Sequence, residues 1–305
     1  MRGTGTGMTI SDPAWERLIG AIRAGDRPSS VYVLGGSDRG KTTLVRWLLE
    51  RLREDRAAAG IDCDPGQATI GPPATIGTEV FGRGSGAARA SALRFVGGTS
   101  PSGHMLELLA GGAALQRKAL ELGAEAAVFD SSGFVLGPVA GEFQYEAIDL
   151  LRPDHLVAVQ RGRELEPLLA NFRRAPWTVV HRLKASEAAV RRGQEQRRQY
   201  RADRWKEYFG AAADRELPLA GIGFHGHVPP WEERTAWEGL LAAVCDAEGF
   251  VLSLGVIAEI DPCWTAMHLH APSFDPGQAA SVQVGTIRRE SPDLASALPW
   301  PPRGP

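Results

Sequence analysis

Residues 35–42 have the types and spacing of a phosphate-binding loop. They read Gly-Gly-Ser-Asp-Arg-Gly-Lys-Thr and fit the pattern Gly-x-x-x-x-Gly-Lys-Ser/Thr. The glycines let the backbone wrap until its N–H groups point at a polyphosphate, and the following helix adds its positive N-terminal end. Lys41 can reach the β- and γ-phosphates, and Thr42 can offer its hydroxyl to Mg²⁺. We expect a bound nucleoside triphosphate, held by Gly35, Gly36, Ser37, Asp38, Arg39, Gly40, Lys41, Thr42 and Thr43.

Carboxylates follow two other apolar stretches. Asp62, Asp64 and Gln67 come after residues 57–61, which we interpret as a short buried strand, and Asp130 ends the stronger strand pattern of residues 126–130. Ligands of doubly wound α/β sheets bind at the carboxyl ends of the strands. Asp62 and Asp130 therefore compete as ligands of Mg²⁺, and Asp64 could accept a proton from an attacking hydroxyl. A solvated Asp-Pro-Gly turn is the alternative interpretation of residues 64–66.

Residues 190–209 are rich in arginine. Arg197, Arg201 and Arg204 fall on one face of a predicted helix by their i, i+4, i+7 spacing. Arginine is suited to bidentate contact with phosphate and to stabilising a phosphoryl group during transfer. A solvated helix face is the alternative, since charge runs commonly form one.

These residues must be positioned by an alternation of strands and helices. The strand before the loop (residues 31–34) is followed by an amphipathic stretch, and further apolar strands end at Asp130 and Gln160. This alternation predicts an α/β P-loop NTPase domain with a mostly parallel sheet flanked by helices. The same strand–loop–helix setting disfavours an accidental glycine-rich turn at residues 35–42. We interpret residues 71–77 as a stiff loop and residues 79–90 as irregular and exposed.

The length and composition set the wider limits. The chain has 305 residues, 43% hydrophobic and 23% charged, which suits a globular protein of two domains. We expect a flexible tail at residues 1–9, the P-loop domain at 10–210, a small β-rich module at 211–290 and a disordered tail at 291–305. The net charge of −2 means that any nucleic-acid site must be a local patch.

Cysteine and histidine usage indicates neither a disulfide framework nor a zinc site. The chain has three scattered cysteines and no Cys-x-x-Cys pair, which favours a reducing cytoplasm. The histidines at 225, 227, 268 and 270 alternate like strand neighbours and favour structural roles. No apolar run approaches the ~20 residues of a membrane span, so no membrane partner is expected.

Taken together, these segments resemble the polynucleotide 5′-hydroxyl kinase family, the Clp/Grc/Nol group of RNA and DNA kinases. The resemblance runs from about Trp15 to Arg289 and rests on four segments. The first two are the P-loop with its Asp38 and the motif Asp62-Cys-Asp64-Pro-Gly-Gln67, which is followed by Gly-Pro-Pro-Ala-Thr-Ile-Gly. The other two are residues 95–101 and an arginine lid. The family's Arg-x-x-x-Arg lid is best matched by Arg197 and Arg201. The family's Thr-x-Gly-Trp clasp corresponds to Ser131-Ser-Gly-Phe134, in which both end residues differ. Because the clasp holds the acceptor strand in this family, the two differences affect how this chain would hold that strand.

The resemblance implies transfer of the γ-phosphate of ATP, or of another triphosphate such as GTP, to the free 5′-hydroxyl of RNA or DNA in the presence of Mg²⁺. Lys41, Asp64, Arg197 and Arg201 are then the catalytic residues, with Asp64 as general base. Thr42, Asp62 and Asp130 serve the metal, and Gln160 lies near the adenine. Candidate acceptor contacts are Gln67, Thr75, Thr99, Ser100, Ser131, Gly133 and Phe134.

Two other classes of function stay open at this point. One is a P-loop kinase or ligase that acts on a small metabolite, which the near-neutral charge mildly favours. The other is a catalytically silent ATP-binding scaffold of an RNA-processing complex, whose protein partners the sequence does not name. The presence of Lys41, Thr42, the carboxylates and the lid arginines argues against the scaffold.

Overall fold

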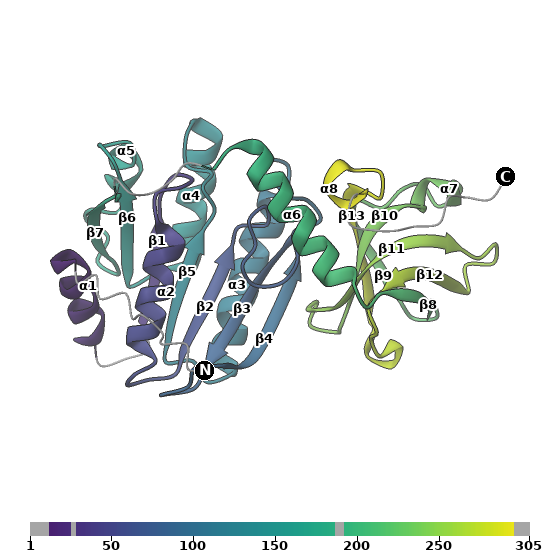
Figure 1. Ribbon diagram of the computed structural model, residues 1–305, viewed down its shortest axis with the longest axis horizontal. Coiled ribbons are helices and arrows are strands. Elements are labelled where there is room, and N and C mark those ends of the chain that lie inside the picture. Colours follow the sequence, from purple (N-terminus) through teal and green to yellow (C-terminus); the bar gives the residue numbers. More distant parts are fainter. Residues whose placement is uncertain (1–11, 26–28, 187–191, 296–305) are drawn as a thin grey trace, which may run out of the picture.

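The chain builds two β-sheets that lie side by side along the long axis of the molecule (Figure 1). The computed structural model describes residues 12–25, 29–186 and 192–295. Helix α6 (Gln194–Phe209) runs from the first sheet to the second. We call the part of the chain up to the end of α6 the P-loop domain and the part after it the C-terminal module.

The sheet of the P-loop domain is mostly parallel, as the sequence predicts. Its strand order is β4-β3-β2-β5-β1-β6-β7, and β3 runs opposite to the other described strands, so that it pairs antiparallel with β2 and β4. The apolar central strands are buried on both faces, which is typical of a parallel sheet covered by helices. The strands are β1 (Ser29–Leu34), β2 (Ala58–Cys63), β3 (Thr75–Phe81), β4 (Ala88–Phe95), β5 (Ala126–Ser131), β6 (His155–Gln160) and β7 (Val179–Lys184).

Helices cover both faces of this sheet. One face packs against α1 (Pro13–Arg23) and α2 (Lys41–Leu52), whose apolar residues share a core with β1 and β5. The other face packs against α3 (Met105–Glu121), α4 (Pro138–Leu151) and the single turn α5 (Glu166–Leu169). In this three-layer arrangement the carboxyl ends of the parallel strands lie along one edge of the sheet. The loops that follow these strands begin at that edge.

Residues 75–81 and 88–90 correct the expectation of a stiff loop and an irregular stretch, because they lie in β3 and β4. Residues 82–87 form a largely exposed turn, as expected. Strand β3 pairs with both β2 and β4, and Thr75 and Thr78 are fully buried in it. Gly77 does not break this strand, because its missing side chain makes room for Leu93: a Cβ there would lie 2.6 Å from Leu93 Cδ2. The glycines that suggest a loop in the sequence therefore allow close packing within a sheet.

The C-terminal module is a second, six-stranded sheet in the order β8-β12-β11-β10-β13-β9. One face carries its own core, which includes the buried Trp237, and the other packs on Phe95, Trp205 and Phe209 of the P-loop domain. This second contact fixes the module against the first sheet and against α6. The elements are β8 (Ala213–Pro218), β9 (Gly223–Gly226), α7 (Arg234–Trp237), β10 (Leu240–Cys245), β11 (Val251–Ile260), β12 (Ala266–Ala271), the 3₁₀ turn η1 (Pro276–Gln278) and β13 (Ser281–Arg288).

Part of the expected C-terminal tail is ordered. Residues 292–295 form α8 (Pro292–Ala295), and Leu294 is fully buried in the core that contains Trp205 and Phe209. The buried leucine anchors this segment to the core. The proline-rich sequence around it is typical of a disordered tail, so the sequence does not indicate this anchor. Residues 1–9 and 296–305 lie outside the described part of the chain.

No helix among the described residues is long and apolar enough to cross a membrane.

A partly buried histidine pair links β6 and β7, the last two strands at one edge of the sheet. His155 Nδ1 on β6 and His181 Nε2 on β7 are 3.0 Å apart. Burial lowers the pKa of both rings, and the neighbouring His155 helps to lower the pKa of His181 to about 4. Histidine in an unfolded chain has a pKa of about 6.5, so the unfolded state binds more protons between these two values. Stability therefore falls as the pH falls through that window.

We predict that lowering the pH from 7.5 to 5 destabilises the protein by roughly 1–2 kcal/mol through this pair. His181→Gln keeps a hydrogen-bonding side chain beside His155 but removes one titrating ring, so its loss of stability should be smaller. Urea midpoints at the two pH values measure this, with His227→Gln at an exposed histidine as the control. Equal losses in the wild type and His181→Gln would contradict the role of the pair.

Candidate active site

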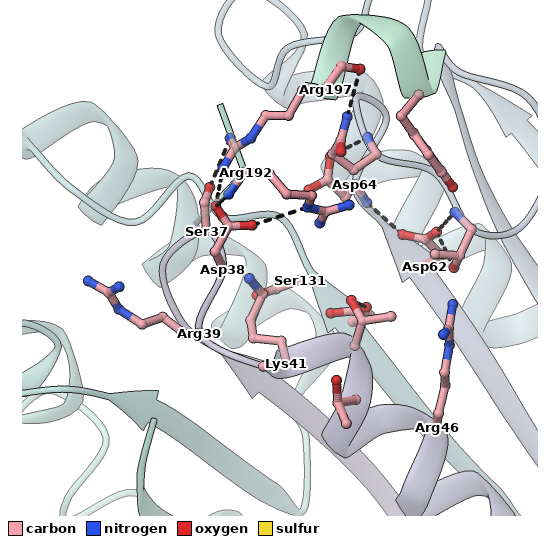
Figure 2. A pocket seen from close by; sticks show the side chains of 18 residues that line it. Ser37, Asp38, Arg39, Lys41, Arg46, Asp62, Asp64, Ser131, Arg192 and Arg197 are labelled. Atoms are coloured by element: carbon pink, nitrogen blue, oxygen red, sulfur yellow. Dashed lines mark hydrogen bonds and ion pairs between the residues drawn. The ribbon is translucent and has the colours of Figure 1, made fainter. Parts of the chain in front are cut away.

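A polar cavity of about 450 Å³ opens at the carboxyl edge of the first sheet (Figure 2). It lies between the P-loop, the ends of β2 and β5, and the first turn of α6. We call it the phosphate cavity because cations gather around it. Its lining is Ser37, Asp38, Arg39, Gly40, Lys41, Thr42, Thr43, Arg46, Asp62, Asp64, Gln67, Thr69, Asp130, Ser131, Gly133, Arg192, Arg197 and Tyr200.

The P-loop adopts the tight conformation that its glycines predict. Gly40 has φ of 88°, in the left-handed region, and passes directly into α2. A Cβ on Gly35 would lie 2.7 Å from the carbonyl oxygen of Val159, so only glycine fits against β6. Lys41 is 8% exposed and its Nζ donates to the carbonyl oxygen of Gly36 over 3.1 Å. Burial lowers the pKa of Lys41, although the charge of Asp130 opposes this.

Asp130 fits the requirements of a magnesium ligand. Thr42 Oγ1 donates to Asp130 Oδ2 over 2.6 Å, so the two side chains proposed for the metal lie side by side. Asp130 Oδ1 is buried and accepts no hydrogen bond within the described residues. Burial raises the pKa of Asp130, and the charge of Lys41 opposes this. A buried oxygen without a donor beside a hydroxyl is a donor set that suits a hard cation.

Asp62 lies beside Asp130 but has other partners. Its Oδ2 accepts from the backbone N–H and the hydroxyl of Thr69 over 2.5 and 2.8 Å, and its Oδ1 accepts from the N–H of Asp64 over 2.9 Å. Burial and the neighbouring Asp130 raise the pKa of Asp62 to about 7. Because both oxygens hold the loop of residues 64–70, Asp130 is the better placed of the two competing carboxylates for the metal.

Asp64 stands where the phosphate cavity meets a second groove. The groove has a volume of about 230 Å³, and Ser37, Asp64, Gln67, Gly133 and Arg197 line both spaces. Its other walls are Gly66, Thr99, Ser100, Pro101, Ser132, Phe134 and Arg201. We call it the acceptor groove. The sequence-predicted residues at 67, 99, 100, 133 and 134 thus come together in one place.

The turn and the site at Asp64 are not alternatives. Asp64 Oδ1 accepts from the N–H groups of Gly66 and Gln67, each over 3.0 Å, as a turn-forming aspartate does. Asp64 Oδ2 has no hydrogen bond within the described residues. The turn therefore fixes one carboxylate oxygen and leaves the other without a hydrogen-bond partner among the described residues.

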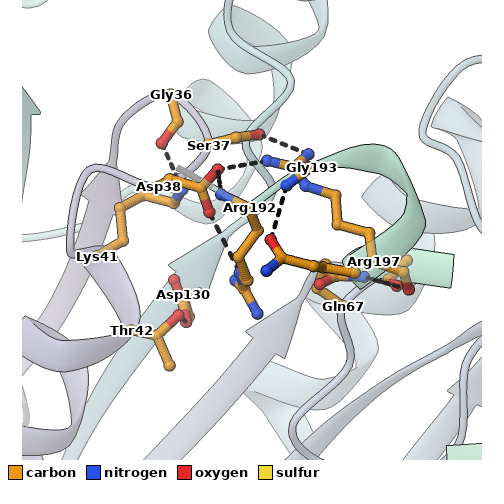
Figure 3. Close-up of polar contacts among 12 residues, drawn as sticks. Gly36, Ser37, Asp38, Lys41, Thr42, Gln67, Asp130, Arg192, Gly193 and Arg197 are labelled. Atoms are coloured by element: carbon orange, nitrogen blue, oxygen red, sulfur yellow. Dashed lines mark hydrogen bonds and ion pairs between the residues drawn. The ribbon is translucent and has the colours of Figure 1, made fainter. Parts of the chain in front are cut away.

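The arginine lid meets the P-loop at Asp38 (Figure 3). The contact is made by Arg192 and Arg197 rather than by the expected pair of Arg197 and Arg201. Arg197 donates to Asp38 Oδ2 over 2.6 Å, and Arg192 pairs with Asp38 Oδ1 over 3.3 Å. The Asp38 side chain is only 4% exposed, and its backbone has φ of 56°. Burial alone would raise the pKa of Asp38, but the hydrogen bonds from Arg197 and Arg192 outweigh it and hold the pKa below its usual value. Asp38 thereby aligns the lid guanidinium groups over the phosphate cavity.

Three of the residues expected in the site have other positions or partners. Thr75 is buried in β3 and donates to the carbonyl oxygen of Pro72 over 2.7 Å, and Gln160 binds Glu166 and the N–H of Leu165. Neither lines the phosphate cavity or the acceptor groove, because each holds a turn at the end of its own strand. Arg201 lines only the acceptor groove and pairs with Asp293 of α8 over 2.6 Å.

Two cationic residues of the site, Arg46 and Arg192, are not among the site residues predicted from the sequence. Arg46 lines the phosphate cavity from α2, four residues after Thr42, so the i, i+4 spacing could have indicated it. Arg192 precedes Gly193, the extended N-cap residue of α6, and contacts Asp38 of the distant P-loop. No spacing rule predicts that contact.

Residues 35–211 match the family model described as the mRNA cleavage and polyadenylation factor CLP1 P-loop. The chain belongs to this CLP1 P-loop family. The matched range begins at the first glycine of the P-loop and ends just after α6, so it contains the phosphate cavity and the lid.

Two curated relatives of the chain are named polyribonucleotide 5′-hydroxyl kinases. That of Methanocaldococcus jannaschii is 32% identical over 211 residues, which is 68% of this chain and 56% of the relative. That of Thermococcus kodakarensis is 32% identical over 224 residues, which is 69% of this chain and 61% of the relative. The chain therefore matches less than two thirds of the length of each.

A solved structure with the same fold is wild-type Clp1p in its complex with Pcf11p. It superposes with a TM-score of 0.68 at 13% sequence identity, covering 90% of this chain and 79% of that one. The coverage of 90% means that the likeness extends over both sheets. At this identity the likeness establishes the fold.

We predict that Asp38→Ala loosens the lid without unfolding the domain. Arg192 and Arg197 lose their shared carboxylate, so backbone amides of residues 193–198 should exchange hydrogen at least several-fold faster. Hydrogen exchange read by mass spectrometry measures this. The matched control is Asp149→Asn, which breaks an exposed ion pair of 3.0 Å with Arg152. Unchanged exchange at residues 193–198 would show that Asp38 does not hold the lid.

Proposed function

We propose that this chain transfers the γ-phosphate of ATP to the free 5′-hydroxyl of a polynucleotide. The observation that carries the proposal is the shared wall between the phosphate cavity and the acceptor groove, where Asp64, Gln67 and Arg197 face both spaces. A group transfer needs donor and acceptor in contact, and this wall is where they would meet. The names of the curated relatives favour RNA as the acceptor.

The donor side rests on charge complementarity. The cations Arg39, Lys41, Arg46, Arg192 and Arg197 surround a space that the P-loop backbone and the start of α2 also make positive. Lys41 would contact the phosphates after leaving the carbonyl oxygen of Gly36. Thr42 and Asp130 would hold Mg²⁺, which supplies charge neutralisation to the phosphates when bound.

The acceptor side rests on Asp64. Its unpartnered Oδ2 can accept the proton of a 5′-hydroxyl that lies in the acceptor groove, while its Oδ1 stays fixed by the turn. Gln67 Oε1 is buried without a hydrogen bond within the described residues, so it can accept a further hydrogen bond from the acceptor. Together they would aim the hydroxyl oxygen toward the γ-phosphate.

Arg197 would stabilise the phosphoryl group in flight. Its Nε is buried without a partner within the described residues, and its other nitrogens contact Ser37 and Asp38 of the P-loop. Arg197 is thus held between donor and acceptor by groups that stay in place during transfer. Arg201, tied to Asp293, would act on the acceptor strand in the groove.

Phe134 would replace the tryptophan of the clasp. Its ring lies 6.2 Å from that of Phe143, and its carbonyl oxygen accepts from Gln144, so the residue is fixed from two sides. A fixed aromatic ring at the wall of the groove can stack on the 5′-terminal base.

We predict that the protein labels the 5′ end of hydroxyl-terminated oligonucleotides from γ-labelled ATP and Mg²⁺. RNA should be the better substrate than DNA of the same sequence, and Lys41→Ala should lose the transfer. Label on neither polymer, with ATP binding demonstrated, would refute the kinase and favour a silent scaffold or a metabolite enzyme.

We further predict that Asp64→Asn lowers kcat by roughly 10²-fold or more with little change in ATP affinity, because general-base catalysis has that magnitude. Asp246→Asn is the matched control: Asp246 makes the same kind of turn through Glu248 and Phe250 but lies in the C-terminal module. Near-normal turnover of Asp64→Asn would remove the residue from the role of base.

A further inference from the structure

A second polar cavity, of about 140 Å³, lies at the seam between the P-loop domain and the C-terminal module. On one side are the loop of residues 96–104 and the first turn of α3. On the other side are β9 and β13. We call it the seam cavity. Its lining is Val96, Gly97, Gly103, His104, Glu107, Gly226, His227, Gln283, Val284, Gly285 and Thr286.

The seam cavity adjoins the acceptor groove through one short turn. Thr99, Ser100 and Pro101 line the groove, whereas Gly103 and His104 line the cavity. The N–H of His104 donates to the carbonyl oxygen of Pro101 over 3.0 Å, which closes a turn of four residues. The ends of such a turn are less than about 7 Å apart. A strand that leaves the groove over this turn therefore reaches the cavity within one or two nucleotides.

An unpartnered polar side chain inside the cavity points to a ligand. Gln283 on β13 is 8% exposed, lines the cavity, and makes no side-chain hydrogen bond within the described residues. The stem of the side chain is buried, but its amide nitrogen and oxygen stay open to the cavity, where a ligand can pair with them. A planar ring edge that both donates and accepts hydrogen bonds is such a ligand.

Close backbone contacts and hydrogen bonds join the two sides of the seam next to the cavity. Gly97 and Gly285 meet back to back: a Cβ on Gly285 would lie 2.8 Å from the carbonyl oxygen of Gly97. The same carbonyl oxygen accepts from the N–H of Thr286 over 2.9 Å and from its hydroxyl over 3.1 Å. Since that hydroxyl gives its proton to Gly97, its oxygen accepts from Nε2 of His104 at 3.2 Å. The imidazole of His104 is thereby fixed in orientation.

The charge of the lining favours a nucleobase over a phosphate group as the ligand of the seam cavity. Within the part of the chain that the structure describes, no lysine or arginine lines the cavity, and Glu107 adds a carboxylate, in contrast to the arginine-rich phosphate cavity. The other polar side chains of the lining are the rings of His104 and His227, the amide of Gln283 and the hydroxyl of Thr286. Imidazole rings stack on bases, and glutamine and glutamate pair with the edges of bases that carry an exocyclic amino group.

We propose that the seam cavity is a subsite for a nucleobase of the acceptor strand, one or two nucleotides downstream of the 5′ end. The proposal rests on the proposed polynucleotide acceptor and adds to it a role for the C-terminal module. Gln283 and Glu107 pair with the base edge, and His104 and His227 contact its faces. The subsite makes the enzyme sensitive to acceptor length and to the base at that position.

The test compares acceptors and variants in one set of measurements. Transfer kinetics are measured on a nucleoside 3′-phosphate and on 5′-hydroxyl RNAs of two to six nucleotides, with an abasic residue placed at each position in turn. Equilibrium binding of the same RNAs is measured separately by fluorescence anisotropy, without ATP. The variants are Gln283→Leu and His227→Ala, and their matched controls are Gln278→Leu and His268→Ala elsewhere in the module.

We expect Gln283→Leu and His227→Ala to raise KM and Kd for RNAs of four or more nucleotides by about five- to tenfold, without changing kcat or the kinetics of the nucleoside 3′-phosphate. One abasic position, the second or the third, should have the same effect in the wild type and none in Gln283→Leu. Equal KM and Kd in variants and wild type would overturn the subsite while transfer itself persists. Binding that depends on Gln283 in the absence of any transfer would support the subsite and refute the kinase. Absence of both binding and transfer would refute both.

Discussion

The hydrogen bond between Thr42 and Asp130 is the contact on which the rest of the site depends. It forms because β1 and β5 are parallel neighbours, with Val33 opposite Asp130, so that the P-loop and the end of β5 leave the sheet together. The bond orients one oxygen of Asp130 and leaves the other buried without a donor. Around this pair the structure sets Lys41 on one side and Asp62 on the other, and Asp62 in turn holds the loop that carries Asp64. A change in the spacing of these strands would therefore displace the donor and acceptor sides at once.

Close backbone contacts place the acceptor side against this centre. A Cβ on Gly133 would collide with Ser37 of the P-loop, and one on Gly66 would collide with the carbonyl oxygen of Thr99. The loop after β5 can therefore lie against the P-loop, and the loop after β2 against the loop after β4, only because these positions are glycine. A close backbone contact that requires glycine also occurs between the two domains, where Gly97 meets Gly285 of the C-terminal module. The module thus stands in direct contact with the loop that lines the acceptor groove.

The sequence predicts the parallel sheet, the P-loop and the grouping of Asp64, Gln67, Thr99, Ser100 and Phe134, because strand ends of such a sheet converge on one edge. It fails where the decisive contact is between distant segments. Thr75 lies in a segment whose glycines and prolines are typical of a loop, but it is buried in β3. Leu294 lies in a proline-rich segment, but its buried side chain anchors α8. The pairing of Arg192 with Asp38 joins residues 154 positions apart. Asp62 and Asp130 differ in their hydrogen bonds, to Thr69 and to Thr42 respectively, and no pattern of residue types specifies these contacts.

The central claim is that the phosphate cavity and the acceptor groove hold the two partners of one transfer across Asp64 and Arg197. The most direct test is the affinity of a bisubstrate compound in which adenosine is joined through four phosphates to the 5′ end of a short RNA. If the two spaces adjoin as described, its Kd should be at least about 100-fold below those of ATP and of the RNA alone, because the second half binds at high effective concentration. It should also exclude both ligands. Binding no tighter than that of ATP, with RNA still able to bind alongside it, would contradict the account.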